Sequence, residues 1–278
     1  MATAERDATY TMGRSEGETE RLIEQAHLYE KMTLRMLRDA GVGDGMKVLD
    51  VGSGAGDVAF AAAQLVGPDG SVTGVDVNPE ILDTARARAE QAGHAQVEFI
   101  AGDARTLDLP DDFDAVIGRL VLMYLADPAE ALKSFAERVR PGGIVAFQEA
   151  EMTLYETIAH PATPVVNKLV EWGLEVFRRS GANIGMGLEL QGAFVEAGLP
   201  SPVANLEAPA GGGPDWAGYE YLQQGFASLL PLIESFGIAT AAEVVVETLA
   251  ERLRQEAAAS GRLIVLPPHV TAYARVPA

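Results

Sequence analysis

Residues 48–57, which read VLDVGSGAGD, constrain the fold of this chain more than any other stretch. The apolar, β-branched run at residues 47–51 has the length of a buried strand. Three glycines at alternate positions, Gly52, Gly54 and Gly56, follow it, and an apolar helical pattern comes next. Glycine adopts positive φ in tight turns and leaves room where a ligand approaches the backbone. A strand, a glycine turn and a helix in this order predict a ligand-binding edge at the carboxyl end of a parallel sheet.

The spacing of the glycines separates two classes of ligand. Dinucleotide enzymes carry Gly-x-Gly-x-x-Gly, with the diphosphate at the helix N-terminus. Here the pattern is Gly-x-Gly-x-Gly, with Ser53 and Ala55 in the gaps, which disfavours a nicotinamide-dependent dehydrogenase. Asp57 stands where a helix N-cap is expected, so its carboxylate can serve the helix alone.

A regular alternation of strand and helix patterns continues to about residue 148 and predicts a parallel sheet with helices on both faces. The second and third strands end in acids, Asp76 and Asp103. The strand patterns cover residues 72–76, 97–103, 113–118 and 140–147, and the helical patterns cover residues 57–66, 79–92 and 128–139.

With five elements matching in order, residues 40–150 resemble the class I S-adenosylmethionine-dependent methyltransferases, in particular their small-molecule, ubiquinone/menaquinone-methyltransferase-like branch. The resemblance implies an α/β fold with a doubly wound, seven-stranded, mostly parallel Rossmann-like sheet. It also implies an antiparallel last strand and helical lid inserts. The implied activity is methyl transfer from S-adenosyl-L-methionine, with S-adenosyl-L-homocysteine as the product. A relative that binds the same cofactor without methylating anything is the alternative.

We expect one methyltransferase domain over residues 1–278, in which a lid covers a core. The core comprises residues 42–149, 186–209 and 261–278, and the lid comprises residues 1–41, 150–185 and 210–260. Outside the alternating part, helices are expected at residues 15–40, 165–179, 188–197, 215–235 and 240–258, and strands at 201–206 and 262–275. A glycine-rich break at residues 211–214 and a Pro-Pro pair at residues 267–268 interrupt this region.

Composition narrows the partners. The net charge of −19 opposes binding to nucleic acid and to anionic membrane surfaces. The chain has no cysteine, so it has no disulfides or thiolate metal sites, and its four histidines lack the spacing of metal ligands. The N-terminus lacks the apolar core of a signal peptide, and no apolar run approaches the roughly 20 residues that span a bilayer. These features predict a cytoplasmic monomer or homodimer that acts on a small molecule.

The resemblance implies cofactor contacts along the predicted binding edge. The residues are Tyr10, Asp50, Gly52, Ser53, Gly54, Gly56, Asp76, Val77, Asp103, Ala104 and Arg119. By resemblance, Asp50 orients the glycine turn and the methionine ammonium; as a bare buried carboxylate it would be costly. The N-terminal helix either covers the sheet as a scaffold or, as in the family, closes over the cofactor with Arg21 and Gln25 as further contacts.

Three of these side chains have specific expected partners. The Asp76 carboxylate can accept two hydrogen bonds from a ribose diol. The alternative is that Asp76 caps the next helix, but Asn78 is better placed for that cap. Asp103 can accept from the adenine amine while the Ala104 N–H reaches a ring nitrogen; a turn-forming aspartate is the alternative. Arg119 either contacts the cofactor, by pairing with its carboxylate or through the backbone, or forms a structural ion pair with a nearby acid.

The acceptor side is less specific. Glu149 and His160 are candidate bases by position, and a solvated glutamate and a surface histidine are the alternatives. The expected acceptor contacts are Tyr124, Glu151, Trp172, Trp216 and Phe226. Apolar side chains of this kind line small-molecule pockets, although some of them can equally pack the lid or a dimer interface. The sequence therefore favours a small, largely apolar acceptor such as a polyketide, terpenoid or quinone-like molecule.

Overall fold

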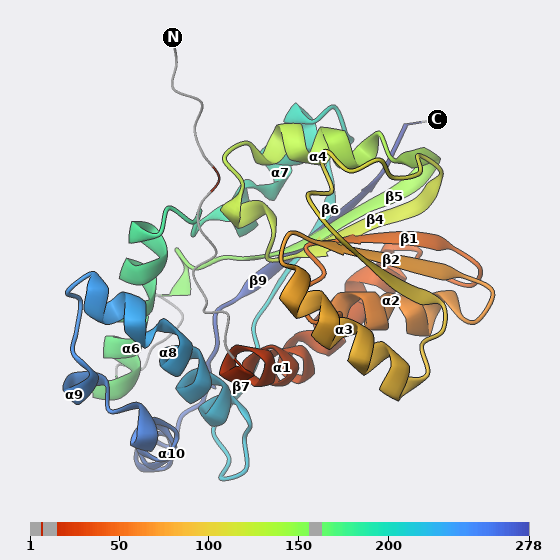
Figure 1. Cartoon of the computed structure of the whole chain (residues 1–278). Helices are drawn as coiled ribbons and strands as arrows, with labels where there is room; N and C mark the ends of the chain where they lie inside the picture. The colour runs from red at the N-terminus through yellow and green to blue at the C-terminus, as the bar shows by residue number, and fades with distance from the viewer. Residues whose placement is uncertain (1–6, 8–15, 156–162, 278) are drawn as a thin grey trace.

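The computed structural model describes residues 7, 16–155 and 163–277, with residues 16–27 described by their backbone alone (Figure 1). Tyr10 and His160 therefore lie outside the described residues, as do the side chains of Arg21 and Gln25. Within the described part, no helix is both long and apolar enough to cross a bilayer.

The described residues form a seven-stranded sheet whose topology confirms the predicted fold class. The strand order is β3-β2-β1-β4-β5-β9-β6, and β9 alone runs antiparallel to its neighbours. The strands in this order are β3 (Val97–Ala101), β2 (Ser71–Asp76), β1 (Lys47–Val51), β4 (Phe113–Arg119), β5 (Val139–Ala150), β9 (His269–Arg275) and β6 (Val203–Glu207). The parallel register pairs Val51 with both Val75 and Gly118, so the carboxyl ends of β1, β2 and β4 meet at one edge.

Helices cover both faces of the sheet (Figure 1). The helices α1 (Glu16–Ala40), α2 (Asp57–Val66) and α3 (Pro79–Ala92) lie on one face, and α4 (Pro128–Ala136) and α7 (Met186–Glu196) lie on the other. Leu37, Ala62 and Leu82 belong to the hydrophobic cluster under the first group. Leu132 and Phe194 belong to the larger cluster on the other face, which continues into the lid. Burial of these apolar faces is the main favourable contribution to the fold.

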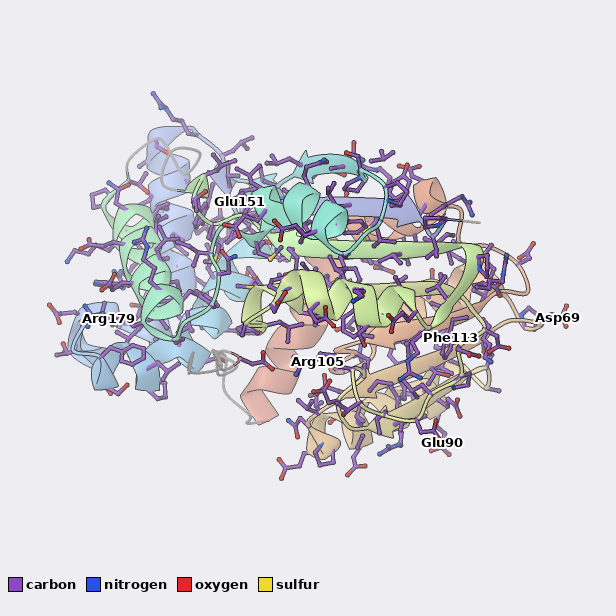
Figure 2. All side chains as sticks on the ribbon, turned by 90° about the horizontal axis from the view of Figure 1, so that it is seen from above. Asp69, Glu90, Arg105, Phe113, Glu151 and Arg179 are labelled. Carbon is purple, nitrogen blue, oxygen red and sulfur yellow. The ribbon has the colours of Figure 1, made fainter. Side chains whose placement is uncertain are left out.

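The other α-helices of the described residues gather beyond the carboxyl edge of the sheet (Figure 1). They are α6 (Pro164–Arg179), α8 (Gly218–Ser235), α9 (Ala241–Val244) and α10 (Leu249–Ser260). Figure 2 shows Arg179, at the end of α6, and Asp69, in the turn before β2, at opposite ends of the molecule. The lid helices and the turns at the amino edge therefore lie far apart, as a lid over the binding edge requires.

One local prediction in this region is confirmed and another was wrong. The strand expected over residues 262–275 is interrupted at Pro267 and Pro268 as predicted, and its first part, β8 (Ile264–Val265), pairs with β7 (Ala210–Gly211) in a separate small sheet. Proline donates no ladder hydrogen bond, so the strand cannot continue through the pair. The helix expected over residues 240–258 is broken after α9, where Val245 has φ +47°.

Candidate functional site

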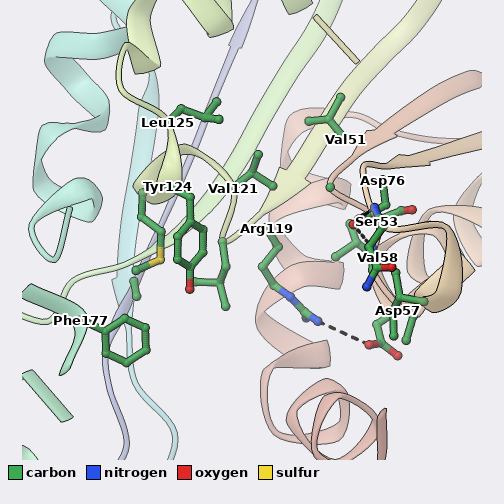
Figure 3. Close-up of a pocket in the computed structure, with 18 of the residues that line it drawn as sticks. Val51, Ser53, Asp57, Val58, Asp76, Arg119, Val121, Tyr124, Leu125 and Phe177 are labelled. Carbon is green, nitrogen blue, oxygen red and sulfur yellow. Dashed lines mark hydrogen bonds and ion pairs between the residues drawn. The ribbon is translucent and has the colours of Figure 1, made fainter. Parts of the chain in front are cut away.

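A cavity of about 770 Å³ lies between the carboxyl edge of the sheet and the lid. Its volume falls within the range of about 300–1,000 Å³ typical of small-molecule sites. One half is walled by the glycine turn and the ends of β2, β3 and β4, and the other half by the lid helices α6 and α8. Figure 3 shows Ser53, Asp57 and Asp76 on one side, Tyr124 and Phe177 on the other, and Arg119 between them.

The glycine turn has the geometry that only glycine tolerates. Gly52, Gly54 and Gly56 have φ values of +65°, +51° and +92°. A Cβ on Gly52 would lie 2.6 Å from Cγ2 of Val121, whereas a Cβ on Gly54 would meet nothing within 4 Å. Gly52, Ser53 and Gly54 line the cavity, and the Ser53 hydroxyl is buried without a hydrogen-bond partner among the described residues.

Gly56 has a different environment from its two neighbours. It does not line the cavity, and a Cβ there would meet the rings of Phe60 and Phe99 at 2.7 and 2.9 Å. Gly56 is also the N-cap residue of α2, so the prediction that Asp57 caps this helix was wrong. The structure therefore gives Gly56 a packing and capping position at the start of α2.

Asp57 instead joins two arginines at the cavity wall. Its Oδ1 accepts a 2.7 Å hydrogen bond from Nη2 of Arg88, and its Oδ2 lies 3.9 Å from Nη2 of Arg119. The Arg119 and Asp57 side chains are 8% and 9% exposed, so the pair is largely desolvated (Figure 3). Nη1 of Arg119 also donates to the hydroxyl of Thr33 at 3.2 Å. Arg119 lines the cavity and has the structural ion pair that the sequence left as one alternative.

Asp50 lies behind the glycine turn rather than on the cavity wall. It is fully buried, and neither carboxylate oxygen has a hydrogen-bond partner of normal geometry among the described residues. Burial raises the pKa of Asp50 well above its usual range, and the charge of Arg119 and the backbone N–H of Ala59 oppose this rise. Desolvation disfavours the charged form, so ionisation of this buried acid beside the site is unfavourable.

The ends of β2 and β3 place polar groups on the cavity wall. Asp76 accepts hydrogen bonds from the backbone N–H groups of Gly54 at 2.9 Å and Asn78 at 2.8 Å. The Asn78 side chain caps α3 through the N–H of Glu80, as the sequence predicts. Val77 lines the cavity with 68% of its surface exposed, which is unusual for an apolar side chain beside a pocket.

Asp103 has a partner that the sequence did not reveal. Its carboxylate accepts from Nη2 of Arg105 at 2.7 Å and from the Arg105 backbone N–H at 2.9 Å, and these bonds lower its pKa. Nη2 of Arg105 also donates to Asp7 at 2.7 Å, and Asp7 accepts from the backbone N–H of Ala126 at 2.9 Å. Asp7, Asp103, Ala104 and Arg105 all line the cavity. Arg105 thus links the end of β3 to residue 7 of the N-terminal arm.

Glu149 and Glu151 do not stand at the cavity mouth as expected. Both are fully buried and neither lines the cavity. Glu149 accepts from the backbone N–H groups of Val121 at 3.0 Å, Leu122 at 2.9 Å and Met123 at 3.3 Å, and burial raises its pKa to about 7. These carboxylate oxygens are therefore occupied as caps of the turn that follows β4, which also contradicts the solvated alternative.

Glu151 has a similar capping position. It accepts from the backbone N–H of Leu188, in the first turn of α7, at 2.9 Å and from that of Thr153 at 3.0 Å. The turn capped by Glu149 begins at Leu120, which has φ +58°. A bulky residue in the left-handed region marks backbone strain, which here turns three N–H groups toward one carboxylate.

The lid presents one stripe of each helix to the cavity. The lining residues are Leu169, Val170, Gly173, Leu174 and Phe177 of α6, and Tyr221, Leu222, Gly225, Phe226 and Leu229 of α8. Their spacing at steps of one and three is that of a single helix face. Of the expected acceptor contacts, Tyr124 and Phe226 line the cavity. Trp172 and Trp216 do not: Trp172 is buried elsewhere in the core, and Trp216 packs edge-on against Tyr219 at 5.1 Å.

His269 is a lining residue that the sequence analysis did not single out as part of the site. It begins β9, is 2% exposed, and stacks on the Tyr29 ring with centroids 4.1 Å apart and planes at 14°. Burial and the charge of Arg119 lower its pKa to about 3, so the ring is neutral at physiological pH. Its ring nitrogen Nδ1 lies 2.9 Å from Nε2 of Gln148.

Comparisons with known proteins agree with this geometry. The methyltransferase-domain family matches residues 43–175. A ubiquinone/menaquinone biosynthesis C-methyltransferase of Pseudomonas fluorescens is 31% identical over 184 residues, which cover 62% of this chain and 71% of the relative. The chain therefore belongs to the class I S-adenosylmethionine-dependent methyltransferases. It is an enzyme of this class, and its cofactor is S-adenosylmethionine.

Two solved structures share the fold at low identity. Phosphoethanolamine N-methyltransferase 2 of Haemonchus contortus, solved with phosphomonomethylethanolamine and S-adenosylhomocysteine, has a TM-score of 0.58 at 16% identity, covering 94% of this chain and 58% of that one. The cyclase SpnF has a TM-score of 0.54 at 18% identity, covering 99% of this chain and 87% of that one. Since a cyclase and an N-methyltransferase share this fold, the fold alone does not define the acceptor.

The residues of the cavity wall fit such a cofactor. A carboxylate at the end of β2 suits a ribose diol, and the exposed apolar surface of Val77 suits the face of an adenine ring. Gly54 opens onto unfilled space at a positive φ, so its backbone is accessible to a ligand. The three features lie on the same half of the cavity.

Proposed function

We propose that this enzyme transfers a methyl group to a small, largely apolar metabolite, such as a quinone-like, polyketide or terpenoid molecule. One continuous cavity of about 770 Å³ supports the proposal, because it joins the glycine turn to an apolar lid. The cofactor half contains the aspartates of the wall, and the lid half contains aliphatic and aromatic side chains. Such a division suits a polar cofactor beside an apolar acceptor.

In this proposal, the residues at the sheet edge hold the cofactor. Asp76 would accept hydrogen bonds from the ribose hydroxyls, and Val77 and the Ala104 backbone would contact the adenine. Asp103 would take part with its carboxylate already oriented by Arg105. Gly52, Ser53 and Gly54 would bind the methionine part, with Asp50 behind them and Arg119 at its side. When bound, S-adenosylmethionine supplies an electrophilic methyl group on its sulfonium.

The contribution of the chain to the reaction is mainly positioning. In-line displacement needs the reacting atoms close together and aligned, which a closed, shaped cavity supplies. The apolar stripes of α6 and α8 would exclude water and orient the acceptor. Glu149 and Glu151 have no place in this proposal as bases, because their oxygens bind backbone N–H groups away from the cavity. The role of His160 stays a prediction, since it lies outside the described residues.

Two further observations bear on the acceptor class. The C-methyltransferase relative acts, by its name, in ubiquinone and menaquinone biosynthesis, which favours a quinone-like acceptor. The net charge of −19 disfavours phosphorylated acceptors, and the several carboxylates on the cavity wall act in the same direction.

The test is product mass after incubation with S-adenosylmethionine carrying a deuterated methyl group. The acceptor panel should contain naphthoquinols, phenolic polyketides, terpenoid alcohols and, as a matched polar control, phosphoethanolamine. We expect labelled product from an apolar member and none from phosphoethanolamine. Methylation of phosphoethanolamine alone would overturn the proposed acceptor class, and cofactor binding without any labelled product would favour a non-methylating activity.

A further inference from the structure

A chain of buried hydrogen bonds runs from Arg119 to His269. Nη1 of Arg119 lies 3.2 Å from Oγ1 of Thr33, and this hydroxyl lies 2.7 Å from Oε1 of Gln148. Nε2 of Gln148 lies 2.9 Å from Nδ1 of His269. Thr33, Gln148 and His269 are 1%, 0% and 2% exposed, so their hydrogen bonds are shielded from water. Buried polar chains of this kind hold their members in one arrangement.

The direction of each bond follows from what each group can donate. Arginine has only donors, so the Thr33 hydroxyl accepts from Arg119 and has its own proton to give. The nearer acceptor for that proton is Oε1 of Gln148 at 2.7 Å, compared with the Tyr29 carbonyl at 3.2 Å. The amide oxygen of Gln148 therefore faces Thr33, and the amide nitrogen faces the imidazole.

A second contact gives the same orientation of Gln148. Its Nε2 also lies 3.4 Å from the sulfur of Met32, which is an acceptor and has no proton to give. The amide nitrogen therefore belongs on the side of Met32 and His269. Because this nitrogen donates to Nδ1, Nδ1 is unprotonated, and the neutral ring has its proton on Nε2.

The ring is also held in position by its neighbours. Tyr29 stacks on it, and the Tyr29 hydroxyl donates to the carbonyl of Pro267 at 3.1 Å. In the sheet, His269 pairs with Ala150 on one side and Glu207 on the other. A turn of the ring out of this plane breaks the stack on Tyr29, and a half-turn within the plane loses the hydrogen bond at Nδ1.

The ring makes one hydrogen bond, at Nδ1, so the remaining nitrogen, Nε2, makes none to any residue in the part of the chain that the structure describes. His269 lines the cavity. A donor left without a partner in a closed site costs about 1–3 kcal/mol. Arg119 lines the same cavity and has only donors, so an acceptor atom suits this region. A carbonyl, phenol or enol oxygen satisfies both conditions.

We propose that the Nε2–H of His269 binds an oxygen of the methyl acceptor, which is therefore a carbonyl compound, a phenol or an enol. Gln148, Thr33 and Arg119 act as positioning residues that hold His269 in this tautomer. In this role His269 presents a donor to the acceptor and removes no proton from it. The inference rests on the proposed function, and it adds the chemical group by which the acceptor is recognised.

The tautomer is tested directly by NMR on the full chain with labelled histidine nitrogens and S-adenosylhomocysteine present. We expect His269, assigned by its loss in His269→Phe, to show a protonated Nε2 and an unprotonated Nδ1. Gln148→Leu removes the donor to Nδ1 and should mix the two tautomers. A protonated Nδ1 in the unmodified protein would overturn the proposal, whatever the enzyme methylates.

Recognition of oxygen is tested with two probes of similar shape, 1-naphthol and 1-methylnaphthalene, titrated into the protein saturated with S-adenosylhomocysteine. We expect the wild type to bind 1-naphthol about tenfold more tightly. His269→Phe keeps a ring on Tyr29 and should abolish this preference, while His94→Phe, outside the cavity, should retain it. If His269→Phe does not fold, Gln148→Leu should reduce the preference several-fold.

Two results would contradict the proposal. They are a preference for 1-naphthol that survives in His269→Phe, and a wild type that binds the two probes equally or binds neither. These outcomes differ from failure of the proposed function. If the preference for 1-naphthol depends on His269 but no methylated product forms, the proposed methylation of apolar acceptors is wrong, while the oxygen-binding role of His269 stands.

Discussion

The backbone N–H of Gly54 donates a 2.9 Å hydrogen bond to Oδ2 of Asp76, so one carboxylate links the glycine turn after β1 to the end of β2. The other oxygen accepts from the N–H of Asn78 at 2.8 Å. Asp76 also lines the cavity, so the side chain that supports the glycine turn lies at the proposed cofactor site.

We predict that Asp76→Ala weakens the binding of S-adenosylmethionine by about 1–3 kcal/mol, because the ribose hydroxyls would lose their acceptor in a closed site. Calorimetric titration of the variant measures the change. Asp112→Ala removes a carboxylate that pairs with Lys47 outside the cavity, and it should bind as the wild type does. Unchanged affinity in a folded Asp76→Ala protein would remove Asp76 from the cofactor site.

Phe226 and Trp172 provide a matched test of the lid. Both side chains are 6% exposed, but Phe226 lines the cavity and Trp172 does not. Truncation of either to alanine should cost about 3–5 kcal/mol of stability. At a temperature where both variants are folded, we expect turnover to fall about 10- to 100-fold in Phe226→Ala alone, since the acceptor would be misplaced.

Cofactor affinity separates this interpretation from a general disturbance of the lid. It should hold in Phe226→Ala and Trp172→Ala, and it is measured by calorimetry alongside steady-state kinetics. Equal losses of turnover in the two variants would assign Phe226 to packing instead of acceptor binding.

Gly52 and Gly54, the two residues of the glycine triplet that line the cavity, differ in a measurable way. Alanine at Gly52 suffers both the positive φ and a Cβ 2.6 Å from Val121, whereas alanine at Gly54 suffers only the positive φ. The left-handed conformation costs about 1–2 kcal/mol in each case. We therefore predict that Gly52→Ala lowers the free energy of unfolding more than Gly54→Ala does.

Removal of the clashing methyl group supplies the control. Val121→Ala deletes Cγ2, so the double variant Gly52→Ala with Val121→Ala should recover part of the stability lost by Gly52→Ala. Denaturant unfolding of the four proteins gives the coupling energy. Strict additivity of the two substitutions would show that the clash does not contribute.

The parts of the site that the sequence predicted are those encoded by local pattern. Gly52, Gly54 and Asp76 follow from glycine spacing and from the parallel sheet, because strand ends must meet at one edge. Glu149 was misplaced because its environment depends on the strained turn at Leu120, which has no local sequence signal. His269 was missed because its position is set by residues far away in the chain, such as Gln148, which lies 121 residues earlier.

The lid shows the same limit in another form. Trp172 and Phe226 are both apolar residues in amphipathic helices, and composition does not distinguish a cavity face from a core face. That distinction depends on how α6 and α8 pack against each other and against the sheet, which is set by tertiary contacts. The prediction for Asp57 failed for a similar reason. Gly56 is the N-cap residue of α2, and the Asp57 carboxylate pairs with Arg88 instead of capping the helix.

Glu149 makes the stability of the fold depend on pH in a defined direction. Burial raises its pKa from 4.5 to about 7 in the folded protein. Between these values the folded state holds a proton that the unfolded state has released, so the stabilising effect of the protonated form is complete below pH 4.5 and is lost as pH rises through 7. The loss amounts to about 3 kcal/mol. The raised pKa of Asp50 makes the free energy of unfolding change with pH in the same direction. The pKa of His269 is lowered to about 3, so its contribution to the free energy of unfolding is lost as pH falls below 6.5.

Because these groups titrate together, the contribution of Glu149 is isolated by comparison with Glu149→Gln. Glutamine stays neutral, so its free energy of unfolding should not fall by this amount between pH 4.5 and 8. At pH 4.5 the wild type should be more stable than Glu149→Gln, because Glu149 keeps its hydrogen bonds to the turn. By pH 8 the wild type should have lost about 3 kcal/mol of this difference. Urea unfolding across the range measures the difference, with the exposed Glu196→Gln as control. Parallel profiles for the wild type and Glu149→Gln would show that Glu149 is ionised in the folded protein throughout, as its three backbone donors alone would favour.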